Sequence, residues 1–179
     1  MSGVVLITRM DWSQARAAFG RLERAIADPT PVMRAIGTGL VTSTQDRMDA
    51  GHDPNGAAWA ALNPVYARGK RGPGILRESG MRGGLQGSIT HRAERDQVEV
   101  GTNKIYGAIH QFGGVIRAKA GGKLAFRMGG KLIRTSSVTV PARPYLGISA
   151  EDGVMILEVV EGALDRALGS GASSSTRPR

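Results

Sequence analysis

The sequence predicts an α+β fold, in which N-terminal helices and a C-terminal helix pack on a mostly antiparallel β-sheet that carries a protruding glycine-rich β-hairpin arm. Three observations predict it. Apolar residues recur every three to four positions near both ends of the chain, which is the period of an amphipathic helix. Short β-branched runs between turn residues fill the middle. The 26 glycines among 179 residues favour turns and hairpins over long continuous helices.

The N-terminal part of the chain predicts one short strand and two helices. Val4 to Thr8 is a β-branched run and predicts a strand or an ordered arm. A helical pattern follows from Asp11 to Ile26, and a second one extends from Pro31 to about Asp49. Gly37 and Gly39 weaken the second helix intrinsically, so we expect them to permit close packing against another element.

The middle of the chain is divided into short elements. In chain order these are a turn-rich loop at 51–56, a short helix at 64–68, a short helix within 75–85, a β-hairpin of 88–92 with 98–101, and a helix at 104–112 ended by two glycines. These elements would supply most of the sheet and the turns that join it to the helices.

The rest of the chain predicts the arm, a closing helix and a tail. Residues 115–140 alternate apolar and basic side chains in three pieces, which glycine pairs separate, and this is typical of a hinged hairpin arm. Ala150 to Leu168 carries an apolar stripe at helical spacing, made of Val154, Leu157, Val160, Leu164 and Leu168. Residues 169–179 are of low complexity and are expected to be disordered. We therefore predict a single domain over 1–168.

The positive charge is concentrated in the middle of the chain. The net charge is +9, and residues 66–134 hold 14 lysines and arginines against 4 aspartates and glutamates. Such clustering suits contact with nucleic acid, because neutralising phosphates releases counterions; it equally suits a solvated surface that keeps the protein soluble. Absence of any apolar run of about 18 residues predicts no membrane partner and a protein that acts in the cytoplasm.

The sequence offers little catalytic chemistry. There is no cysteine, so disulfides, thiolate nucleophiles and zinc ribbons are excluded, and stability must come from packing or from neighbouring copies. Asp49, Asp53 and Asn55 only loosely match a calcium loop, which lacks its closing glutamate. His110 is the best single catalytic candidate, but a lone histidine among apolar neighbours is more often a structural residue. We expect no enzyme, no cofactor and no metal.

Four local patterns in fixed order carry a family resemblance. They are Asp53-Pro54-Asn55-Gly56 followed by Trp59 and Leu62; Leu76-Arg77-Glu78-Ser79-Gly80-Met81 with Ser88-Ile89; the run from Tyr106 to Gly114; and Pro141-Ala142-Arg143-Pro144-Tyr145-Leu146-Gly147 before an acidic helix. Together, over about residues 32–168, they resemble the phage virion morphogenesis proteins, or tail completion proteins, of Mu-like and other contractile-tailed phages.

The resemblance implies a structural virion protein needed to complete tails or to join them to filled heads, with no catalytic activity. On this basis we expect a ring-forming oligomer, a hexamer, around the DNA channel at the head–tail junction. Its partners would be other neck and tail proteins, such as the connector, tail terminator or tube, and packaged DNA through non-specific contacts. The expected location is the virion, and the host cytoplasm during assembly.

Two sets of residues are the candidate contact sites. The candidates for interfaces are Trp59, Tyr106, His110, Phe112, Arg143, Tyr145 and Leu146. The candidates for contact with DNA or a partner protein are Arg117, Lys119, Lys123, Arg127, Lys131 and Arg134. For the first set, the alternative is that residues 141–147 are an ordinary rigid connection and that Tyr145 is buried in the core of its own chain. For the second, apolar residues alternating with the basic ones favour a protein neighbour over DNA.

Two other functions compete with assembly. The first is a non-sequence-specific DNA-binding protein outside the virion, which the basic middle supports; its cations lie on turns and hairpins, which suits phosphate contact rather than base readout. The second is an enzyme such as a nuclease or peptidoglycan hydrolase. It lacks the paired acids or metal ligands that those reactions use.

Overall fold

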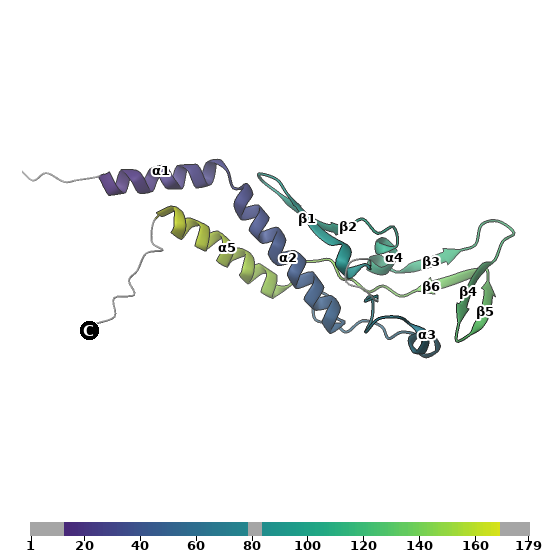
Figure 1. Ribbon diagram of the computed structural model, residues 1–179. Coiled ribbons are helices and arrows are strands. Elements are labelled where there is room, and N and C mark those ends of the chain that lie inside the picture. The colour runs from purple at the N-terminus through teal and green to yellow at the C-terminus, as the bar shows by residue number, and fades with distance from the viewer. Residues whose placement is uncertain (1–12, 79–83, 169–179) are drawn as a thin grey trace, which may run out of the picture.

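The computed structural model describes residues 13–78 and 84–168, so the strand predicted at Val4 to Thr8 and the tail at 169–179 lie outside it. The molecule is elongated, with its long helices toward one end and the arm at the other (Figure 1). The helices are α1 Ser13–Ala27, α2 Thr30–Ala50, α3 Pro64–Gly69, the 3-10 helix Gln86–Ser88, α4 Gly107–Phe112 and α5 Ala150–Leu168. The strands are β1 Ile89–Ala93, β2 Val98–Thr102, β3 Gly114–Arg117, β4 Leu124–Met128, β5 Lys131–Thr135 and β6 Ser137–Val140.

The predicted α+β class is confirmed, but the strands do not form one sheet. Among the described residues they make three separate two-stranded antiparallel ladders, β1–β2, β3–β6 and β4–β5. Helix α2 packs on the β1–β2 hairpin, while the main contacts of α5 are with α1 and α2. The C-terminal helix therefore packs mainly on other helices, where the sequence predicted packing on the sheet.

Helix α2 is the central element, because it packs against both the β1–β2 hairpin and α5. One of its two glycines faces each of these neighbours. A Cβ atom at Gly37 would lie 2.5 Å from Cδ2 of His91 on β1, and one at Gly39 would lie 2.7 Å from Sδ of Met155 on α5. Both distances are too short for a real Cβ contact, so a larger residue would force the hairpin side chains at Gly37, or the Met155 side chain at Gly39, to move. The close packing expected at both positions is confirmed.

The arm at residues 115–140 is a hairpin, as predicted, built from two ladders in series. Its base pairs β3 with β6, from Gly114 opposite Val140 to Arg117 opposite Ser137. Its tip pairs β4 with β5 through a two-residue turn at Gly129 and Gly130, whose φ angles are +59° and +79°. A turn with two positive φ angles favours glycine at both positions and matches the twist of the strands.

A cluster of buried apolar residues lies where α2 meets the β1–β2 hairpin and the 141–147 segment. Its members are Met48, Trp59, Leu76, Leu85, Ile89 and Tyr145. The helix predicted within 75–85 is not seen in the described part of that range: Leu76 has a φ of +58°, and the helical turn begins only at Gln86. Residues 79–83 lie outside the described structure.

Candidate functional site

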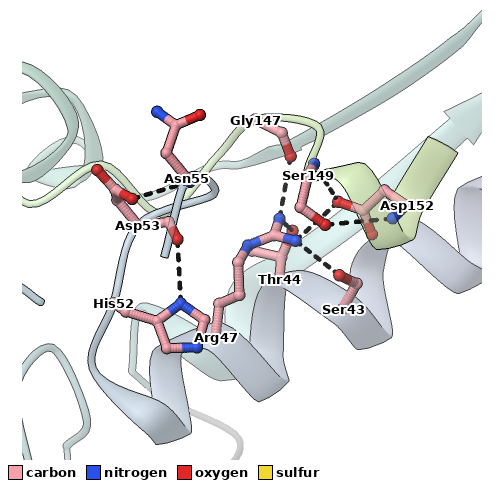
Figure 2. Close-up of polar contacts among 9 residues, drawn as sticks. All are labelled: Ser43, Thr44, Arg47, His52, Asp53, Asn55, Gly147, Ser149 and Asp152. Carbon is pink, nitrogen blue, oxygen red and sulfur yellow. Dashed lines mark hydrogen bonds and ion pairs between the residues drawn. The ribbon is translucent and has the colours of Figure 1, made fainter. Parts of the chain in front are cut away.

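A buried polar cluster joins α2 to the start of α5, as Figure 2 shows. The guanidinium of Arg47 donates to Oδ2 of Asp152 at 2.7 Å, to the Ser43 hydroxyl at 2.6 Å and to the carbonyl of Gly147 at 3.0 Å. The side chains of Arg47 and Asp152 keep only 6% and 2% of their exposure. This cluster fixes the direction in which α5 leaves the 147–149 loop.

The carboxylate of Asp152 also caps the N-terminus of α5. The amide of Ser149 donates to Asp152 Oδ2 at 2.8 Å, and the amide of Asp152 donates to Ser149 Oγ at 3.2 Å, which is a reciprocal capping box. Burial alone would raise the pKa of Asp152, but hydrogen bonds from Ser149, Ser43 and Arg47 together with the arginine charge hold it below its ordinary value. Sequence reasoning missed this cluster, although the Ser149-x-x-Asp152 spacing could have indicated the cap.

The acids of the loosely matched calcium loop are occupied by protein groups. Asp53 Oδ1 accepts from the amides of Asn55 and Ala57 at 2.8 and 2.9 Å. Asp49 Oδ1 pairs with Arg77 Nε at 2.7 Å. Within residues 13–78 and 84–168 no group of three or more histidine, cysteine, aspartate or glutamate side chains lies close enough to hold a metal ion.

Three of the predicted interface residues lie inside the protein instead. Trp59 is buried and donates its indole N–H to the Pro144 carbonyl at 2.8 Å. Arg143 is buried and donates to the carbonyls of Ala60 and Ala61 at 2.9 and 3.1 Å. Tyr145 is a core residue. Within one chain these three side chains join the 59–61 segment to the 141–147 segment, and a role for them in an interface between chains stays a prediction.

Gln111 is the partner that sequence reasoning overlooked in this region. Its Oε1 accepts the amides of Tyr145 and Leu146, both at 3.0 Å, and its Nε2 donates to the Leu146 carbonyl at 2.9 Å. The α4 helix therefore holds the 145–146 backbone through one side chain. Leu146 is half-buried against the core, whereas Phe112 at the end of α4 is 78% exposed and remains available to a partner.

A groove of about 730 Å³ separates the arm from the body and collects several of the predicted residues. Tyr106, His110 and Arg143 line its body side, and Phe126 and Arg127 line its arm side. The Tyr106 hydroxyl donates to Glu78 Oε1 at 3.1 Å, and its ring meets that of His110 edge-on, with centroids 6.0 Å apart. Burial, followed by the hydrogen bond to Glu78 and its charge, raises the pKa of Tyr106.

His110 is partly buried, and its backbone joins α4 to the 141–147 segment. Burial, with the nearby charge of Arg143, lowers the pKa of His110, so the ring is neutral at pH 7. Its Nδ1 is buried and has no hydrogen-bond partner among the described residues. Its backbone carbonyl accepts from the Arg143 amide at 2.7 Å, which ties α4 to the 141–147 segment.

The six basic candidates of the arm are all exposed. They lie on both ladders and the loop between them: Arg117, Lys119, Lys123, Arg127, Lys131 and Arg134. None of them forms an ion pair with an acid of the described residues. The arm, which forms one end of the elongated molecule (Figure 1), therefore carries six exposed cations.

Helix α5, at the opposite end of the molecule, exposes apolar and acidic side chains, whereas the arm exposes basic ones. Its apolar stripe, which the sequence placed at helical spacing, is exposed in this chain: Val154, Leu157, Val160, Leu164 and Leu168. Its exposed acids are Glu151, Glu158, Glu161 and Asp165. No helix of the described residues is long and apolar enough to span a bilayer.

Comparison with known proteins gives one family. Residues 10–165 match the model of the phage virion morphogenesis family. The chain is 31% identical over 145 residues to the Mu-like prophage FluMu G protein 2 of Haemophilus influenzae, covering 81% of this chain and 85% of that one. It is 29% identical over 140 residues to protein G of Escherichia phage Mu, whose name assigns it provisionally to capsid assembly, covering 76% and 80%. No solved structure gives a significant match.

Proposed function

This chain belongs to the phage virion morphogenesis family, and we propose that it is a tail completion protein that acts at the head–tail junction. In this proposal it is a non-enzymatic, ring-forming oligomer around the DNA channel. The observation that carries the proposal is the amount of apolar surface that a single chain leaves uncovered on α5, on the arm and at Phe112. Contiguous exposed apolar surface on a soluble chain is typical of a subunit that is completed by its neighbours.

The positions of these surfaces support a ring. The arm and α5 lie at opposite ends of the molecule, so a contact between them would join copies head to tail (Figure 1). Head-to-tail interfaces close into rings when the rotation allows it. We expect a hexamer in the virion, assembled in the host cytoplasm, with the connector, the tail terminator or the tube as neighbours and packaged DNA passing through.

A second candidate function is non-sequence-specific DNA binding. The exposed cations of the arm favour it, because lysine and arginine on a projecting hairpin can neutralise phosphates. The exposed leucines and valines of α5 argue against it as the whole function, since a phosphate backbone would leave them uncovered.

Deletion of the gene from the phage or prophage that carries it tests the proposal. Negative-stain electron microscopy of the lysate should show filled heads and separate tails, with few joined particles. Supplying the wild-type chain in trans should restore joined particles. Normal yields of joined, infectious particles without the gene would overturn tail completion, and empty or absent heads with normal tails would move the function to head assembly.

A further inference from the structure

We propose that the arm of one copy binds the exposed face of α5 on a second copy of this chain. The proposal deepens the ring-forming function above by naming the two surfaces that meet. It is carried by the side chains that each surface leaves exposed and by their opposite charges.

The α5 surface consists of two parallel ridges. Glu151, Glu158 and Asp165 are spaced seven residues apart, so they form one acidic line along the helix, two turns per step. Beside it runs a mostly apolar line in which Leu157 is 62% exposed, continued by Val154, Leu164 and Leu168. The exposed acid Glu161 lies within this second line. A partner that fits this face needs basic and apolar side chains next to one another.

The tip of the arm offers that combination. In the β4–β5 register Arg127 lies opposite Leu132, and Ala125 lies opposite Arg134. Since side chains alternate between the two faces of a ladder, Arg127, Leu132 and Arg134 share one face. All three are exposed, Leu132 by 53%. This face is a leucine flanked by two guanidinium groups.

Charge repulsion excludes the two symmetric contacts, which are α5 against α5 and arm against arm. Two α5 helices packed on each other would bring two acidic lines together, and two arms would bring arginines together, and like charges across an interface cost several kcal/mol. The arm has no acidic residue between Arg117 and Arg134, whereas α5 exposes four acids and one base, Arg166. Only the unlike pair neutralises both surfaces and covers both sets of apolar side chains.

Because the chain contains no cysteine, single introduced cysteines can test the contact directly. Full-length Leu132→Cys and Leu157→Cys variants, carrying tags of different size, are mixed under mild oxidation. A disulfide between the two tagged chains is expected in the mixture, with little homodimer when each variant is alone. No mixed disulfide, or equal homodimers of either variant alone, would overturn the proposed contact.

Charge reversal supplies the matched control. Arg127→Glu with Arg134→Glu in the Leu132→Cys chain, or Glu158→Lys with Asp165→Lys in the Leu157→Cys chain, should each lower the rate of mixed disulfide formation at least about tenfold. Mixing the two reversed chains should restore it. These positions are exposed, so circular dichroism should show an unchanged fold. Failure of the reversed pair to recover would contradict the charge pairing.

The disulfide experiment and the gene deletion test two different claims, so either claim can fail while the other holds. Unjoined heads and tails in the deletion, with no mixed disulfide, would keep tail completion and refute the contact between arm and α5. A mixed disulfide with normal particles in the deletion would keep the contact and refute tail completion.

Discussion

Arg47 on α2 and Asp152 on α5 form an ion pair 2.7 Å long that is almost completely withdrawn from solvent. The two residues are 105 positions apart, and the pair lies at the point where the 141–149 segment becomes α5. It therefore sets the orientation of α5, whose exposed face is the surface proposed to bind the arm of another copy.

Removing Asp152 should be far more costly than removing an exposed acid. Asp152→Ala leaves the Arg47 charge buried and unpaired and removes the cap of α5, so we expect the free energy of unfolding to fall by about 3–5 kcal/mol. The matched control is Glu94→Ala, which breaks the exposed pair with Arg92 and should cost about 0–1 kcal/mol. Urea unfolding of both variants measures the difference. Equal costs would show that the buried pair does not anchor α5.

The contribution of Asp152 should depend on pH in a defined direction. Its folded pKa is held below the ordinary 3.8, so the unfolded chain binds its proton more readily than the folded chain does. The stabilisation is therefore complete above the ordinary value and is lost as pH falls through the lower folded pKa. Urea unfolding between pH 7 and pH 2 should show the difference between wild type and Asp152→Ala shrinking only below about pH 4. A difference that shrinks between pH 7 and pH 5 would contradict this cause.

Alanine should have opposite effects at different helical glycines. Gly37→Ala places a Cβ against His91 and Val98, which sit on a paired hairpin, so we expect a loss of about 1–3 kcal/mol. Gly39→Ala meets only the flexible thioether of Met155 and should cost less. Gly153→Ala meets nothing within 4 Å and should gain about 0.5–1 kcal/mol from helix propensity. Thermal unfolding ranks the three, and a gain at Gly37 would refute the close-approach argument.

Periodicity predicted the helices and hairpins well because each of those signals is local. The α2 helix was expected from Pro31 to about Asp49 and is found at Thr30–Ala50, and the hairpin of β1 and β2 was expected within a residue of its bounds. An apolar stripe on α5 was also predicted, but a stripe does not say which partner covers it, and in one chain the stripe is exposed.

The candidate site was predicted less well because its contacts join distant segments. Trp59 and Tyr145 stood out as aromatic residues in short patterned runs, yet long-range bonds such as that from Trp59 to the Pro144 carbonyl draw them into the core. No local pattern reveals that Arg47 will meet Asp152. The basic residues of the arm could be located from the sequence alone. Their exposure does not depend on contacts with distant segments.

Hydrogen exchange should distinguish the arm from the other hairpin. Amides at 119–134 should exchange quickly in the monomer, because a two-stranded ladder with one face in water is only marginally stable by itself. They should become protected when copies associate. The β1–β2 hairpin is the internal control, since α2 covers it and its protection should be the same in both states. Full protection of 119–134 in the monomer would refute the idea that assembly orders the arm.

The last prediction separates a protein neighbour from DNA as the main partner of the arm. Replacing Lys123, Arg127 and Lys131 with Gln removes half of the arm's six cations and should weaken self-association, measured by analytical ultracentrifugation, and reduce its salt dependence. The matched control replaces Arg16, Arg24 and Arg34, which are also exposed but lie on α1 and α2, and should leave self-association unchanged. If DNA were the partner, each lost phosphate contact would lower the salt slope of DNA binding by roughly one unit while self-association stayed intact. We expect the first result, because Leu132 and Phe126 lie exposed beside these cations and only a protein surface would cover them.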